Sequence, residues 1–241
     1  MRVAGVIGLR GPDIAKRDAL RGYKVEWKDA DRPLVRPHTG LPVLTLDNGE
    51  PKVERHVFGF SRKFSSFNAR DDRLVDGKMW KPLFGDPKHH GVAPVSYIME
   101  WADLGDGRGR VPLRIERADG AAMAVPALTG AYWEDRKERA FALVTITPNE
   151  FFGSFHDRMT ASLRDEDVDR WLHAEGGADK LLKMVQRPPP NDELVAYPLD
   201  KKATPVKMEA GDLLHAVGPA IRWTDVQRGA LRKRAPRQAT L

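Results

Sequence analysis

The sequence predicts an α+β, mostly β fold, which we expect to be a closed or half-closed β-barrel with a few peripheral helices. Short apolar runs of strand length recur between residues 41 and 146, and glycine, asparagine and aspartate separate several of them. The clearest helical pair comes late, after residue 160. Because helices do not alternate with the strands, the pattern disfavours a doubly wound parallel sheet.

The expected strands follow in chain order. Residues 41–46 form a buried strand that ends in the turn Asp-Asn-Gly-Glu, and residues 55–60 form the next one. Residues 91–101 are expected to form a single strand, and residues 103–110 a hairpin loop. The remaining expected strands are residues 111–120, 122–133, 141–148 and 193–199.

Helices are expected at three places. A short helix lies within residues 12–23, opened by Asp13. Ser162 and Asp165 resemble a capping box for a helix that ends at two glycines, residues 176–177, and residues 178–186 form a second short helix. The chain thus divides into an N-terminal segment (1–35), a barrel domain (36–224) and a basic tail (225–241), which we expect to be flexible.

Composition limits the chemistry. The 241 residues contain no cysteine, which excludes disulfides, thiolate zinc sites and cysteine nucleophiles within them. The net charge of +6 is compatible with nucleic-acid binding. No apolar run has the length that spans a membrane, so we expect a cytoplasmic protein that does not bind membranes.

The common catalytic and metal-binding motifs are absent. There is no phosphate-binding glycine loop, no Gly-x-Ser-x-Gly and no His-Glu-x-x-His. His89 and His90 are adjacent, but their spacing matches no common metal site. We therefore expect neither a metal nor a cofactor.

Four polar residues lie at or near the ends of apolar strands, where a barrel opens. Glu100 and His156 are candidates for proton transfer, with Trp101 expected to shield Glu100 from water. Asn68 and Arg70 could hold a sugar and a phosphate. The alternative is that each belongs to a local hydrogen-bond network without a catalytic role.

Six short motifs give these residues a context. In chain order they are Phe-Asn-Ala-Arg (67–70), Met-Trp-Lys-Pro-Leu-Phe (79–84), Tyr-Ile-Met-Glu-Trp (97–101), Leu-Val-Thr (143–145), Phe-His-Asp-Arg-Met (155–159) and Tyr-Pro-Leu-Asp-Lys-Lys-Ala-Thr-Pro-Val-Lys (197–207). In order and rough spacing the chain resembles the SRAP (SOS response-associated peptidase) family over residues 40–210. The resemblance implies an SRAP-like barrel that recognises abasic sites in single-stranded or junction DNA.

Individual roles follow from the resemblance. It implies that Asn68 contacts the sugar, that Arg70 contacts a phosphate and that Thr145 lines the pocket. Glu100 would be the general acid/base, and His156 would assist ring opening. The residues expected to contact DNA are Arg62, Lys63, Arg70, Lys78, Lys81, Phe58, Phe60, Phe64, Trp101 and Thr145.

The chain departs from the family at the start. SRAP proteins form a thiazolidine with the abasic aldehyde through an N-terminal cysteine, whereas this sequence begins Met-Arg-Val. Three interpretations follow. The α-amino group of Met1 could form a Schiff base that allows strand cleavage; the barrel could bind DNA without chemistry; or it could be an inactive scaffold that meets a protein partner through its N-terminal segment or basic tail.

Overall fold

Five strands close into a barrel, which confirms the mostly β barrel with few helices that the sequence predicts. The computed structural model describes residues 6–64, 66–104, 109–201 and 215–228. Within these ranges the barrel strands pair in the order β10–β4–β3–β6–β9, and β9 pairs with β10 to close the ring. The pairs are antiparallel except that of β4 with β10. The barrel strands are β3 (Gly40–Asp47), β4 (Glu50–Phe58), β6 (His90–Val95), β9 (Met123–Ala131) and β10 (Arg139–Ile146).

The hairpin between β3 and β4 has the turn that the sequence predicts. Asn48 and Gly49 connect the strands with φ angles of 52° and 85°. A two-residue hairpin turn of this kind needs positive φ at both positions, which asparagine and glycine adopt most readily. The short turn fixes the register of β3 against β4 from Gly40 to Asp47.

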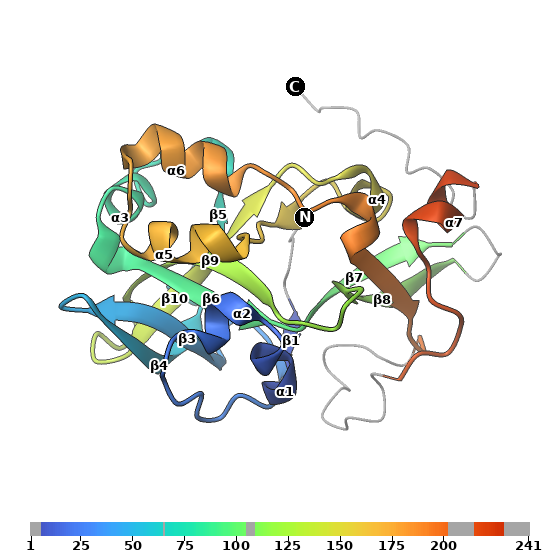
Figure 1. Ribbon diagram of the computed structural model, residues 1–241, viewed down its shortest axis with the longest axis horizontal. Coiled ribbons are helices and arrows are strands. Elements are labelled where there is room, and N and C mark those ends of the chain that lie inside the picture. Colours follow the sequence, from blue (N-terminus) through green and yellow to red (C-terminus); the bar gives the residue numbers. More distant parts are fainter. Residues whose placement is uncertain (1–5, 65, 105–108, 202–214, 229–241) are drawn as a thin grey trace.

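A second, antiparallel sheet lies beside the barrel in Figure 1. The expectation of one strand over residues 91–101 is wrong, because the chain passes from the barrel to this sheet at Ser96. The backbone N–H of Ser96 donates to Gly8 (2.8 Å), and its hydroxyl accepts from the Arg10 N–H (2.9 Å). The order is β12 (Leu194–Pro198), β8 (Arg110–Arg117), β7 (Tyr97–Asp103), β1 (Ile7–Leu9) and β2 (Arg32–Val35).

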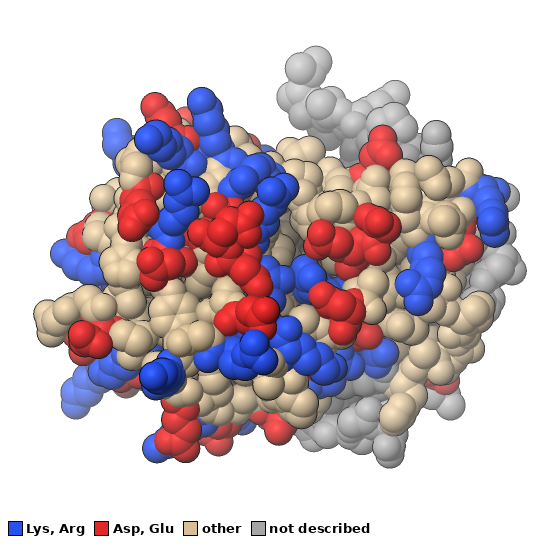
Figure 2. All heavy atoms as spheres, viewed as in Figure 1, with Lys and Arg blue, Asp and Glu red and all other residues tan. Residues whose placement is uncertain are grey.

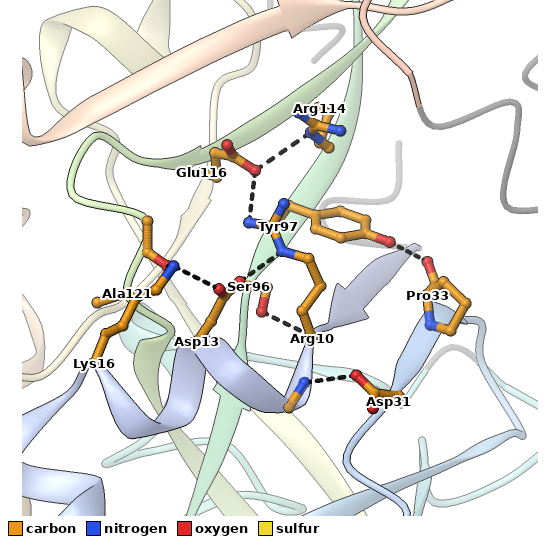
Figure 3. A network of polar contacts seen from close by, with 12 residues as sticks. Arg10, Asp13, Lys16, Asp31, Pro33, Ser96, Tyr97, Arg114, Glu116 and Ala121 are labelled. Atoms are coloured by element: carbon orange, nitrogen blue, oxygen red, sulfur yellow. Dashed lines mark hydrogen bonds and ion pairs between the residues drawn. The ribbon is translucent and has the colours of Figure 1, made fainter.

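The N-terminal segment is joined to this sheet by a network of polar contacts (Figure 3). Arg10 donates to Asp13 (2.6 Å) and to Glu116 (3.0 Å), two carboxylates that are nearly buried. The Tyr97 hydroxyl donates to the carbonyl of Pro33. Buried carboxylates need such partners to offset the loss of water, so the network anchors the segment to strands β7 and β8.

Several helices cover one side of the barrel (Figure 1). The Trp171 indole donates to the Gly91 carbonyl (2.8 Å), and the buried His90 ring contacts the carbonyls of Trp171 and Phe84. His90 is therefore part of the packing between helix and barrel. The helices are α1 (Gly11–Ala15), α2 (Asp18–Arg21), α3 (Lys81–Phe84), α4 (Glu150–Gly153), α5 (Asp165–Leu172), α6 (Gly177–Val185) and α7 (Trp223–Gln227), with 3₁₀ turns at Asp71–Arg73, Pro87–His89 and Asn191–Glu193.

Details of the helix ends differ from the sequence prediction. The capping residue of α5 is Arg164 rather than Ser162, without a side-chain cap, and α5 ends before the two glycines, which instead begin α6. Helix α7 crosses the expected domain boundary at residue 224, and residues 229–241 of the tail lie outside the described residues. No helix in the described ranges is both long enough and apolar enough to cross a membrane.

Candidate functional site

Three of the sequence motifs meet at the end of β10. Strand β5 (Asn68–Arg70) runs parallel to β10, with Asn68 opposite Leu143 and Arg70 opposite Thr145. Strand β11 (Met159–Thr160) pairs with the other edge of β10, with Thr160 opposite Thr145. Thr145 thus lies between Arg70 on one edge of β10 and the segment that follows His156 on the other.

Arg158 ties these strands together. Its guanidinium donates to the Asp71 carboxylate and to the Thr145 carbonyl, and it lies 3.5 Å from the Thr145 hydroxyl. Gln186, just after α6, donates to the other Asp71 oxygen (2.9 Å). Asp71 is 6% exposed. Sequence reasoning missed Asp71, whose partners lie 87 and 115 positions away along the chain.

His156 is buried and is held from both sides. Its backbone N–H donates to the Phe152 carbonyl at the end of α4 (3.0 Å). Its Nδ1 lies 3.1 Å from the Arg158 backbone nitrogen, 3.2 Å from the Arg158 carbonyl oxygen and 3.0 Å from the carboxylate of Asp157. These contacts fix the position of the imidazole ring, so a proton that His156 donates or accepts is transferred at one defined position in the site.

Glu100 belongs to the other sheet, on β7, and is 6% exposed. Residues i and i+2 of a strand face the same side, so Glu100 shares its face with Ile98. Ile98 lines a small apolar cavity with Phe152 and Met159, which flank His156 in sequence. The Glu100 strand therefore faces the His156 segment across this cavity.

The expectation that Trp101 shields Glu100 is wrong. Adjacent residues of a strand point to opposite faces, so the partly exposed Trp101 side chain lies on the other side of β7. Burial of Glu100 comes from the inner face of the sheet, where its cross-strand neighbour Leu113 is fully buried. Trp101 therefore does not share the buried face of β7 on which Glu100 lies.

Arg70, at the end of β5, has an exposed side chain. It forms two parallel hydrogen bonds with Asp72, from Nε (2.9 Å) and from Nη2 (2.7 Å). The bonds from Arg70 hold the pKa of the Asp72 carboxyl below its usual range, and they raise the pKa of Arg70. The pair carries one positive and one negative charge at neutral pH.

The three phenylalanines that were expected to stack on bases have different environments. Phe58 is fully buried against Phe141 (centroids 5.1 Å apart) and Phe67 (5.7 Å), so the prediction that it contacts DNA is wrong. Phe60 is 3% exposed and packs edge-on against Trp80. Phe64 alone of the three is well exposed, at 38%.

Phe64 is part of an open groove with a second aromatic residue. Trp133 is 49% exposed and packs edge-to-face with Phe64 at 4.8 Å, and the Arg136 guanidinium lies 6.0 Å from the Trp133 ring centre. Lys78 and Met79 also line this groove of about 550 Å³, which we call the aromatic groove. Sequence reasoning missed Trp133 because it read the residue as the end of a strand.

The basic residues expected at DNA are at the surface. Arg62, Lys63, Lys78 and Lys81 are all exposed. On the face seen in Figure 2, basic and acidic side chains are interspersed and form no uniform basic area. Met1 lies outside the described residues. Among the residues that are described, no group of three or more histidine and carboxylate side chains could hold a metal ion.

Comparison with known proteins gives one family. The sequence profile of the SOS response associated peptidase (SRAP) family matches residues 34–206. The abasic site processing protein YoaM of Bacillus subtilis (strain 168) is 26% identical over 160 residues, which cover 64% of this chain and 67% of YoaM. The abasic site processing protein YobE of the same organism is 27% identical over 138 residues, which cover 56% of this chain and 61% of YobE.

Solved structures share the fold. A crystal structure of a phage-related protein from Bordetella bronchiseptica is similar with a TM-score of 0.65 and 19% identity, covering 81% of this chain and 93% of the other. A protein from Bacteroides thetaiotaomicron has a TM-score of 0.62 and 15% identity, covering 86% of this chain and 99% of the other.

Proposed function

This chain belongs to the SRAP family, and from that premise we propose that it binds single-stranded or junction DNA at abasic sites. The observation that supports the proposal is that β5, with Asn68 and Arg70, and β11, which follows His156, pair with the two edges of β10 at Thr145. Relatives at 24–27% identity are named abasic site processing proteins, which supports the same class of ligand.

The aromatic groove supports a single-stranded ligand. Aromatic rings stack on unpaired bases of any sequence, and basic residues at the edge hold the backbone. Phe64 and Trp133 supply the rings, while Lys78 and Arg136 supply the charge. A ligand recognised by a missing base requires this kind of sequence-tolerant contact.

In this proposal Asn68, Glu100 and His156 act on the open-chain sugar. Asn68 holds the sugar and Arg70 a neighbouring phosphate. Thr145 is fully buried, like Phe58, so it supports the site through its contact with Arg158, and the expectation that it contacts DNA is wrong. Glu100 and His156 lie on elements that face one another, which suits a pair that moves protons on either side of an aldehyde. No thiazolidine forms with a residue of this sequence, because none is a cysteine.

An amine could replace the thiol. The Val6 carbonyl accepts from the Met99 N–H (3.1 Å), one residue from Glu100. Five residues span at most about 17 Å, a length that allows the α-amino group of Met1 to reach Glu100. The amine nitrogen would bond to the aldehyde carbon, and the carbonyl oxygen would leave as water. Loss of the adjacent sugar proton would then expel the 3′ phosphate.

Fluorescence anisotropy with an oligonucleotide that carries one abasic site tests the binding. We expect Arg70→Ala to weaken binding about tenfold, since one charged phosphate contact is lost. Arg21→Ala is the matched control, because Arg21 is also exposed and pairs with a nearby aspartate, Asp18 (2.6 Å). Equal effects of the two substitutions would argue against a phosphate at Arg70.

A denaturing gel with and without borohydride separates the amine route from binding alone. A borohydride-dependent adduct with strand cleavage, reduced in Glu100→Gln, supports the Schiff base. Binding without adduct or cleavage supports a binding module. Absence of binding at low salt contradicts both and favours a scaffold with a protein partner.

A further inference from the structure

Two arginines at the proposed site are each paired with one of two consecutive carboxylates. Arg158 donates to Asp71, and Arg70 donates to Asp72. The pairs differ in exposure: the side chains of Arg158 and Asp71 are 15% and 8% exposed, whereas those of Arg70 and Asp72 are 56% and 48% exposed. The first pair therefore belongs to the folded framework, and the second can open in water at little cost.

Asp72 occupies the part of Arg70 that a phosphate would use. Arginine binds carboxylates and phosphates alike through two parallel N–H bonds. Here Oδ1 accepts from Nε and Oδ2 accepts from Nη2, so both donors of that edge are taken. Of the other charged groups nearby, Asp71 and Asp157 also favour the charged form of Arg70, while Arg73 and Arg158 favour the ionised form of Asp72.

We propose that Asp72 is an intramolecular competitor for DNA phosphate at Arg70 and thereby sets the affinity of the site for DNA. The inference rests on the proposed function, since it takes DNA as the ligand. A phosphate that binds the Nε/Nη2 edge of Arg70 must displace Asp72, and the displaced carboxylate then lies near a second negative charge. Both effects weaken the hold on the strand.

Competition by Asp72 is expected to weaken binding of an intact strand more than binding of an abasic strand. An intact strand offers phosphates and bases but no aldehyde, so it has few other contacts with which to offset the displacement of Asp72. A strand with an abasic site adds contacts in the pocket. Because bonding to Arg70 keeps the pKa of Asp72 below its usual range, the carboxylate stays ionised and the competition persists at neutral pH.

The chain contains a matched control for this idea. Arg117 and Asp119, at the end of β8, have the same spacing and the same two-bond geometry as Arg70 and Asp72, with Nε to Oδ1 at 3.0 Å. Asp119 is about as exposed as Asp72, whereas Arg117 is 16% exposed and also pairs with Glu193. Asp72→Asn and Asp119→Asn change the net charge by the same amount. A difference between them therefore reports the position of the carboxylate and not the total charge.

The test is an anisotropy titration of the full chain with an intact single-stranded oligonucleotide and with the same strand carrying one abasic site, at several salt concentrations. We expect Asp72→Asn to bind about three- to tenfold tighter than the unsubstituted protein, with a steeper salt dependence by about 0.7 in the logarithmic slope. Asp119→Asn is expected to stay within about twofold.

Each outcome is decisive. Tighter binding by Asp72→Asn alone supports the competitor, including the case in which only this variant binds measurably. If the unsubstituted protein binds and Asp72→Asn is no tighter than Asp119→Asn, the competitor is wrong while the proposed function stands. If neither the unsubstituted protein nor Asp72→Asn binds DNA, both proposals are overturned.

Discussion

Substitution of Asp71 by alanine is expected to destabilise the whole fold. The Asp71 carboxylate accepts from Arg158 and from Gln186, and its loss would leave the Arg158 guanidinium, in a side chain 15% exposed, without its charge partner. Breaking a buried ion pair on one side costs about 3–5 kcal/mol, and the slight exposure places this pair near 3 kcal/mol. For a chain of this size that lowers the melting temperature by about 6–12 °C.

Urea denaturation followed by circular dichroism measures this loss of unfolding free energy, with Asp72→Ala as the control. Asp72 is adjacent in sequence and also pairs with an arginine, but its pair is about half exposed and is expected to contribute about 1 kcal/mol or less. If the two variants lose the same free energy within about 0.5 kcal/mol, the Arg158–Asp71 contact does not hold the strands together as described.

Three further predictions concern stability and binding. His56 is buried, neither of its ring nitrogens has a hydrogen-bond partner among the described residues, and burial lowers its pKa to about 3. Because the pKa of this histidine is higher in the unfolded chain, the unfolding free energy should fall by up to about 5 kcal/mol as the pH drops from about 6.5 to 3. His56→Leu should lack this component when stability is measured against pH in acid. Phe58→Ala should cost about 3–5 kcal/mol in unfolding free energy, because Phe58 lies in the core. Phe64→Ala should leave stability nearly unchanged and weaken single-strand binding about tenfold or more. The reverse pattern would contradict the assignment of Phe58 to the core and of Phe64 to the DNA-binding surface. Lys78→Ala should reduce the salt dependence of DNA binding by about one phosphate contact, and an unchanged slope would remove Lys78 from the interface.

The sequence indicates those parts of the fold that local chemistry determines. Asn48 and Gly49 mark a hairpin turn because few other residues adopt positive φ at both positions. The break at Ser96 is different, because residues on both sides of it are apolar and buried, and the pattern is that of one long strand. Only the contacts of Ser96 with the distant residues Gly8 and Arg10 show that the chain changes sheets.

Some residues of the candidate site are likewise recognisable from the sequence, whereas others are found only from the fold. The motif residues Asn68, Arg70 and His156 are recognisable in sequence, and strand pairing attaches Asn68 and Arg70 to one edge of β10 and the segment that follows His156 to the other. Asp71 follows the first motif directly, yet its role depends on partners far away in the chain. From the sequence pattern Trp133 is assigned to the end of a strand, and only the structure shows that its side chain is exposed beside Phe64.

Abasic-site recognition predicts that this protein has different affinities for damaged and intact strands. The measurement is the dissociation constant of the full chain for one single-stranded oligonucleotide with and without a single abasic site, at low salt. Because the proposed contact of Asn68 with the open-chain sugar exists only in the damaged strand, we expect the abasic strand to bind at least about tenfold tighter, a difference of about 1.4 kcal/mol. Equal affinity for the two strands would contradict abasic-site recognition by this chain.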